Sequence, residues 1–123
     1  MKIAITSTGS ELNSDIDPRF GRAAYFIIYD TESNEFEAID NSENAAAGSG
    51  VGIKSGQLMI DKGVKWVITG SVGPNAFQVL SSAGIKVASG ASGKVAEAIE
   101  AFKSGKFSET DSPTAQSHHG LQQ

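Results

Sequence analysis

The 123-residue sequence contains no cysteine. The chain therefore has no disulfide, no thiolate nucleophile, and no Cys-ligated zinc site or conventional iron–sulfur cluster. Long apolar runs are missing too, because no stretch approaches the roughly 18 residues of a membrane-spanning helix. The short apolar run at residues 3–5 is typical of a strand rather than a signal peptide. We therefore expect a cytoplasmic protein that has no membrane partner.

Histidine and positive charge are also scarce. The only histidines are His118 and His119, near the C-terminus, so a Ser-His-Asp triad is not credible. Ten Lys and Arg against fourteen Asp and Glu give a net charge of −4, which argues against general nucleic-acid binding. Residues 1–43 hold nine of the acids but only three bases. Both arginines of the chain, Arg19 and Arg22, lie in this acidic part.

The remaining composition is that of an ordinary globular protein. Apolar residues make up 39% and charged residues 20%, and the length suits one domain. Glycine is frequent, with 14 residues. Residues 108–123 have no apolar periodicity, which predicts a mobile tail. We therefore expect a single domain over residues 1–107.

Apolar periodicity predicts five strands and three helices. The predicted order is a strand at 2–6, strands at 25–29 and 35–40, a helix at 51–62, a strand at 64–69, a helix at 74–83, a strand at 85–88, and a helix that Ser92 caps and Gly105 ends. Residues 41–50 are expected to be a polar loop. The order β-β-β-α-β-α-β-α predicts an α/β protein with a mixed sheet and helices on its faces.

The first candidate binding motif is Asp17-Pro18-Arg19-Phe20-Gly21-Arg22-Ala23, just before a predicted strand. Guanidinium groups bind oxyanions in a bidentate manner, and a glycine between them allows close backbone approach. In the alternative interpretation, which the sequence leaves open, Arg19 and Arg22 neutralise nearby carboxylates such as Asp15 and Asp17.

Two glycine-rich loops are further candidates. Residues 44–52 (NAAAGSGVG) open a predicted helix, where free N–H groups and the helix dipole favour anions. A dinucleotide fingerprint would need a glycine in place of Ile53. Residues 69–76 (TGSVGPNA) begin at the carboxyl end of a predicted strand, which is where open α/β sheets bind ligands. Close packing of small residues would explain both loops equally well.

Taken together and in this order, the motifs resemble those of the small dinitrogenase iron–molybdenum cofactor-binding proteins. The resemblance covers roughly residues 1–107. It implies a ribonuclease H-like three-layer α/β/α fold with a five-stranded mixed sheet. The cofactor-binding residues that it implies are Arg19, Phe20, Gly21, Arg22, Asn44, Gly48, Ser49, Gly50, Gly70, Ser71 and Gly73.

The resemblance also implies a function. It points to non-catalytic binding of an iron–molybdenum cofactor or an anionic metal–sulfur precursor, in a role related to nitrogen fixation. Cluster-assembly or acceptor proteins would be its partners. Many relatives carry a histidine just before the glycine of the second loop, where this chain has alanines at 45–47. Three possibilities remain. The protein binds the cluster without a direct metal ligand, His118 or His119 ligates the metal, or the site binds another anion.

Two other functions compete with this one. Arg19 and Arg22 would also suit a small phosphorylated or carboxylated metabolite. A ribonuclease H-like fold invites a two-metal hydrolase, but that chemistry needs carboxylates on the first strand. The first strand, Ile3-Ala4-Ile5-Thr6, has none. We therefore expect a binding protein rather than an enzyme.

Overall fold

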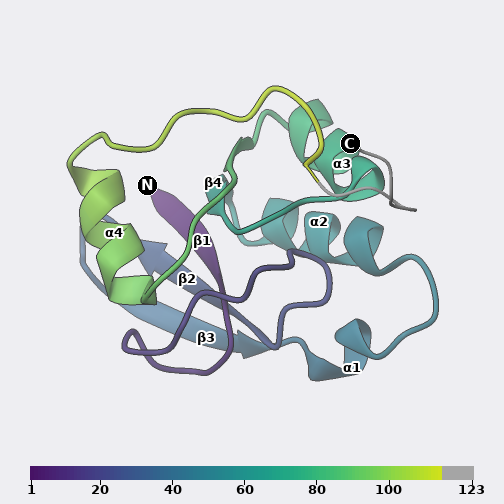
Figure 1. Cartoon of the computed structure of the whole chain (residues 1–123), viewed down its shortest axis with the longest axis horizontal. Helices are drawn as coiled ribbons and strands as arrows, with labels where there is room; N and C mark the ends of the chain where they lie inside the picture. Colours follow the sequence, from purple (N-terminus) through teal and green to yellow (C-terminus); the bar gives the residue numbers. More distant parts are fainter. Residues whose placement is uncertain (115–123) are drawn as a thin grey trace.

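The computed structural model describes residues 1–114, which form a five-stranded mixed sheet flanked by helices (Figure 1). The strands are β1 (Lys2–Ser7), β2 (Tyr25–Asp30), β3 (Phe36–Asp40), β4 (Val64–Ile68) and β5 (Lys86–Ala88). Their order across the sheet is β3-β2-β1-β4-β5. β2 runs antiparallel to β1 and β3, whereas β4 runs parallel to β1 and β5. The predicted α/β class and mixed five-stranded sheet are confirmed.

The helices cover both faces of this sheet. They are α1 (Ser42–Ala45), α2 (Val51–Asp61), α3 (Pro74–Ser82) and α4 (Val95–Lys103). Met59 of α2 and Leu80 of α3 are buried in one cluster with Ala4 of β1. Ile99 of α4 is buried on the other face with Ile5 of β1. Because side chains alternate along a strand, the apolar run of β1 supplies both cores at once.

The last helix begins later than predicted, so the assignment of Ser92 as its cap is wrong. The N-cap is Lys94, whose backbone N–H donates to Glu97 Oε1 at 3.0 Å. Before it, the Gly93 carbonyl accepts a hydrogen bond from the Ile16 N–H at 2.8 Å. This pairing with the long loop after β1, together with the left-handed φ of 93° at Gly93, keeps residues 93 and 94 out of the helix. The predicted polar loop at 41–50 differs as well, because it contains the short helix α1.

Two residues of the predicted mobile tail, Thr110 and Thr114, are hydrogen-bonded to β5 and to the β4–α3 loop, respectively. The Thr110 N–H donates to the Val87 carbonyl at 2.6 Å, on the outer side of β5. The Thr114 N–H donates to the Val72 carbonyl at 2.9 Å, and Thr114 Oγ1 accepts from the Val72 N–H at 3.0 Å. The rest of the predicted tail lies outside the described residues, and the domain boundary at 107 stays a prediction. None of the helices within residues 1–114 has the length and apolar character to cross a membrane.

Candidate functional site

Three loops meet in a pocket of about 450 Å³ beyond the carboxyl ends of β1 and β4. They are the arginine loop (residues 17–24), the glycine-rich loop before α2, and the loop between β4 and α3. The lining residues are Arg19, Phe20, Gly21, Arg22, Ser49, Gly50, Val51, Gly52, Ser71, Gly73, Pro74, Asn75 and Ala76. Eight of the eleven residues singled out from the sequence are among them. The structure thus brings all three predicted motifs to one place.

Two helix N-termini open into this pocket. Gly50 is the N-cap of α2 and Gly73 is the N-cap of α3, and neither N-cap has a side-chain hydrogen bond within the described residues. Neither helix has an acidic residue in its first turn. The first N–H groups of a helix lack intrahelical partners and carry the positive end of its dipole. Gly50 has φ of 72°, a left-handed conformation that favours glycine.

The arginine loop is held by a buried carboxylate, Asp17. Asp17 Oδ1 accepts a hydrogen bond from the Arg19 N–H at 3.1 Å, and its Oδ2 accepts one from the Ala24 N–H at 3.2 Å. Phe20 is buried in the core, where its ring lies 5.3 Å from that of Phe26. The Phe20 N–H also donates to the Ser71 carbonyl at 3.1 Å. The loop is therefore fixed at both ends and joined to the β4–α3 loop.

Each of the two arginines uses part of its guanidinium group for contacts within the protein. Arg19 Nε lies 3.7 Å from Asp17 Oδ1, while its side chain is 60% exposed. Arg22 Nη1 donates to the carbonyl oxygens of Ala45 and Ala47 at 2.7 and 3.2 Å. Since a guanidinium has five N–H donors, both arginines keep donors for a ligand. Neutralisation of Asp17 by an arginine is confirmed, whereas Asp15 pairs with a lysine, Lys94, at 2.9 Å.

Glycine in the arginine loop lets the loop touch α2. A Cβ placed on Gly21 would lie 3.2 Å from both N and Cα of Gly52, which is tighter than ordinary contact. Behind this contact, Asn41 Nδ2 donates to the carbonyls of Gly21 and Ala23 at 3.1 and 2.8 Å. The floor of the pocket is therefore built from closely packed backbone.

Three predicted site residues do not line the pocket. Asn44 lies behind it, where Nδ2 donates to Ser55 Oγ at 2.9 Å and to the Val51 carbonyl at 3.2 Å. Gly70 packs against the backbone of Pro18, and Gly48 is exposed with no neighbour near its Cα hydrogens. His118 and His119 lie outside the described residues. Asn44 is thus a supporting residue of the glycine-rich loop.

The sequence reasoning missed the first-turn residues of both helices. Val51, Gly52, Pro74, Asn75 and Ala76 line the pocket but were not singled out. A signal was available, because each of the two glycine-rich motifs ended at a predicted helix start, where free N–H groups are expected. The support by Asn41 and Ser55 had no such signal, since it depends on loops meeting in three dimensions.

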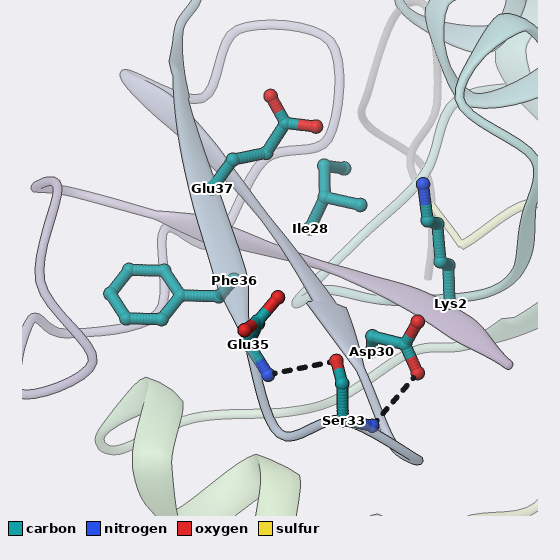
Figure 2. Close-up of a pocket in the computed structure, with 7 residues that line it drawn as sticks. All are labelled: Lys2, Ile28, Asp30, Ser33, Glu35, Phe36 and Glu37. Carbon is teal, nitrogen blue, oxygen red and sulfur yellow. Dashed lines mark hydrogen bonds between the residues drawn. The ribbon is translucent and has the colours of Figure 1, made fainter.

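A second hollow of about 360 Å³ lies at the other end of the sheet (Figure 2). Its lining includes the carboxylates of Asp30, Glu35 and Glu37 and one lysine, Lys2. Asp30 Oδ1 accepts hydrogen bonds from the turn amides of Glu32 and Ser33, and the first of these is the main cause that lowers the pKa of Asp30. This acidic surface suits no anion.

The pocket at the helix N-termini offers hydrogen-bond donors rather than metal ligands. Among the described residues, its lining contains no carboxylate, thiol or imidazole. Nowhere in residues 1–114 do three His, Cys, Asp or Glu side chains gather as a metal site. The arrangement can therefore hold an anion by charge and hydrogen bonds.

Several known proteins are similar to this chain in sequence and in fold. A family model described as dinitrogenase iron-molybdenum cofactor matches residues 1–105. An uncharacterized protein of Methanocaldococcus jannaschii is 33% identical over 109 residues, which is 87% of this chain and 89% of that protein. The apo form of the orange protein from Desulfovibrio gigas superposes with a TM-score of 0.89 and 37% identity, over 93% of this chain and 96% of that chain. A putative NifB protein from Thermotoga gives a TM-score of 0.79 and 43% identity, over 93% and 98%.

Proposed function

The chain belongs to the dinitrogenase iron-molybdenum cofactor family, and on that premise we propose that it is a non-catalytic carrier of an anionic metal–sulfur cluster or cluster precursor. The observation that carries this proposal is the convergence of two uncapped helix N-termini and two arginines on one pocket. Family membership is what the ordered motifs of the sequence predicted.

The chemistry of the pocket supports a carrier. Metal–sulfur clusters are commonly anionic, and the sulfides at their surface accept hydrogen bonds. Backbone amides, guanidinium groups and the hydroxyls of Ser49 and Ser71 are all donors. A cargo held only by such contacts leaves without breaking a metal–protein bond, which suits transfer to another protein.

Several finer assignments belong to the same proposal. We assign a ribonuclease H-like fold because the strand order is β3-β2-β1-β4-β5 and β2 runs antiparallel to its neighbours. The carrier would act in the cytoplasm and exchange its cargo with cluster-assembly or acceptor proteins, in a role related to nitrogen fixation. The support for the partners and the role is the family alone.

The alternative ligand is a small phosphorylated or carboxylated metabolite. The same donors would serve it, because arginine and helix N-termini bind phosphate and carboxylate as well as sulfide. The two hypotheses share one pocket and differ only in the ligand, so a direct comparison of ligands separates them.

The test is an anaerobic titration of the protein with tetrathiomolybdate, followed by visible absorption and by the melting temperature. A bound ligand raises the melting temperature of the folded state. Replacing Arg19 by Ala removes an exposed guanidinium of the pocket and should weaken binding about tenfold. The matched control is Lys65→Ala, which removes one positive charge from an exposed position of β4.

Pyrophosphate and adenosine monophosphate are titrated in parallel. Tighter binding of either phosphate than of tetrathiomolybdate would favour the metabolite alternative. Failure of all three to bind, or equal weakening by Arg19→Ala and Lys65→Ala, would contradict the proposed pocket.

A further inference from the structure

The glycine-rich loop before α2 is held by few contacts. Its residues 46–50 (AAGSG) join α1 to α2 and stand out from the body of the molecule (Figure 1). No side chain in this stretch is longer than that of serine, so none reaches the core. Within residues 1–114, the N–H groups of Gly48, Ser49 and Gly50 donate no hydrogen bond to the backbone. Segments with so few buried contacts open easily, so the position of this loop depends on the contacts that remain.

Arg22 supplies one of these contacts. Its Nη1 donates to the Ala45 carbonyl at 2.7 Å, just before the loop, and to the Ala47 carbonyl at 3.2 Å, within it. These two bonds use both hydrogens of Nη1, and the guanidinium has further N–H groups on Nη2 and Nε. Arg22 also lines the pocket. One rigid planar group can therefore hold the loop with one edge and an anion with another.

Arg19 lines the same pocket but contacts a different part of the chain. Its Nε lies 3.7 Å from Asp17 Oδ1, and its backbone N–H donates to the same carboxylate. Among the described residues, no hydrogen bond joins the Arg19 side chain to the glycine-rich loop. The two arginines thus bring the same charge to one pocket, and Arg22 is the one that links this charge to the loop.

Building on the proposed function, we propose that Arg22 couples the occupancy of the pocket to the position of the glycine-rich loop. A bound anion accepts hydrogen bonds from Nη2 or Nε and fixes the guanidinium. The fixed guanidinium holds the carbonyls of Ala45 and Ala47, so the loop becomes ordered beside the N-terminus of α2. Because such coupling is reciprocal, a change that orders the loop tightens anion binding by the same factor. A receiving protein that displaces the loop would loosen the cargo in the same way.

The first test is hydrogen exchange of residues 46–50 in the full chain, with and without saturating tetrathiomolybdate under anaerobic conditions. In the wild-type chain the anion should slow this exchange at least about fivefold. Arg22→Lys keeps the positive charge, but its single ammonium nitrogen offers no rigid fork that joins loop and anion. This variant should bind the anion at higher concentration without slower exchange in the loop. Arg19→Lys, the matched variant, should show the slowing once it is saturated.

The second test orders the loop directly. A Cβ added at Gly48 would meet nothing within 4 Å, and Gly48 is not among the glycines of positive φ. Gly48→Ala therefore suits the observed backbone and narrows the conformations open to the loop. It should tighten tetrathiomolybdate binding about two- to fivefold, because less order is lost on binding.

In the Arg22→Lys background, Gly48→Ala should leave the affinity unchanged, because the loop is then disconnected from the anion. The four affinities form a double-mutant cycle, whose interaction term measures the coupling. A purely structural role of Arg22 would lower the free energy of unfolding in urea but would give no such interaction term.

The outcomes separate this inference from the proposed function. Absence of tetrathiomolybdate binding in the wild-type chain contradicts the carrier function itself. Binding without slower exchange in the loop, or equal slowing in Arg22→Lys, overturns the coupling and leaves the carrier function standing. If Arg22→Lys binds too weakly to be saturated, Gly48→Ala decides alone. An unchanged affinity in that variant overturns the coupling, because a loop that is already ordered gains nothing from restriction.

Discussion

Asp17 connects the stability of the fold to the geometry of the pocket. Its carboxylate is buried at 4% exposure and accepts the amide hydrogens of Arg19 and Ala24. It also lies beside the Arg19 guanidinium. One side chain therefore fixes both ends of the arginine loop and directs one of its charges.

Replacing Asp17 by Ala should lower the free energy of unfolding by about 1–3 kcal/mol, because two partly buried N–H groups lose their acceptor. Urea denaturation measures this change. Asp17→Asn keeps one acceptor oxygen and should cost less. A loss that is the same for both variants would contradict the role of the two hydrogen bonds.

Asp40 makes stability depend on pH in acid. Hydrogen bonds from the Ser42 hydroxyl and amide, at 2.7 and 2.8 Å, lower the pKa of the Asp40 carboxyl from its ordinary value of 3.8. The folded chain then binds this proton less readily than the unfolded chain. The stabilisation is present above the unfolded pKa and is lost as the pH falls through the lower folded pKa.

Urea midpoints between about pH 5 and about pH 2 should therefore fall less steeply in Asp40→Asn than in the wild-type chain. Ser42→Ala should give part of the same flattening, because the hydroxyl is the larger cause. An acid slope that neither substitution changes would refute this assignment.

At the scale of elements, the sequence predicted the strands and the three long helices because their apolar periods agree with their packing. β1 and α4 are clear examples, since Ile3, Ala4 and Ile5 of β1 and the helical stripe of Val95, Ala98, Ile99 and Phe102 in α4 pack in the two cores. The misplaced cap of α4 arose because Ser92 is a good local cap, whereas pairing of Gly93 with Ile16 keeps residues 93 and 94 out of the helix. Periodicity carries no information about such a long-range contact.

In the candidate site, too, the sequence predicted local motifs but not the contacts between loops. The arginine and glycine motifs were visible because guanidinium groups and the N–H groups at a helix start both bind anions, although packing explained the glycines equally well. Asn44 was placed in the pocket by its motif but lies behind it, where Ser55 and the Val51 carbonyl bind its amide. Which side of a loop faces a ligand depends on the other loops, so a linear motif does not determine it.

Asn75 offers a test in which stability and binding move in opposite directions. It lies in the first turn of α3 and lines the pocket. Asn75→Asp places a negative charge at the positive end of the helix dipole and should stabilise the fold by about 0.3–1 kcal/mol. The same charge should repel an anion and weaken tetrathiomolybdate binding about fivefold or more.

Chemical denaturation and titration measure the two effects on one sample. Gln78→Glu adds the same charge one turn later on α3, outside the pocket lining, and should leave affinity nearly unchanged. Tighter or equal binding by Asn75→Asp would exclude the N-terminus of α3 from the site.

At the scale of the whole molecule, the two edge strands of the sheet are protected from pairing with another chain in different ways. The outer side of β5 is covered, because Thr110 bonds to the Val87 carbonyl and its Oγ1 accepts the Ser89 N–H at 3.0 Å. β3 has no neighbouring strand on its outer side within the described residues. It carries Glu37 and Asp40 instead, and charges along an edge discourage pairing with another chain.

A chain that ends at Ser108 should therefore be less stable than one that ends at Thr114. The shorter chain loses the hydrogen bonds of Thr110 and Thr114, together about 1–3 kcal/mol, and uncovers the edge of β5. Urea denaturation measures the first effect, and sedimentation at several concentrations detects self-association through the second. Equal stability of the two chains would show that residues 109–114 do not protect this edge.

The two ends of the described chain lie near opposite ends of the central strands. The Met1 ammonium donates to Thr31 Oγ1 at 3.2 Å, beside the turn that joins β2 and β3, whereas Thr114 is bound next to the pocket. A hexahistidine tag at the C-terminus thus adds six metal-binding imidazoles to the end of the chain whose described part lies beside the pocket. A tag fused before Met1 would extend from the far end. Recombinant protein for any metal measurement should carry its tag at the N-terminus.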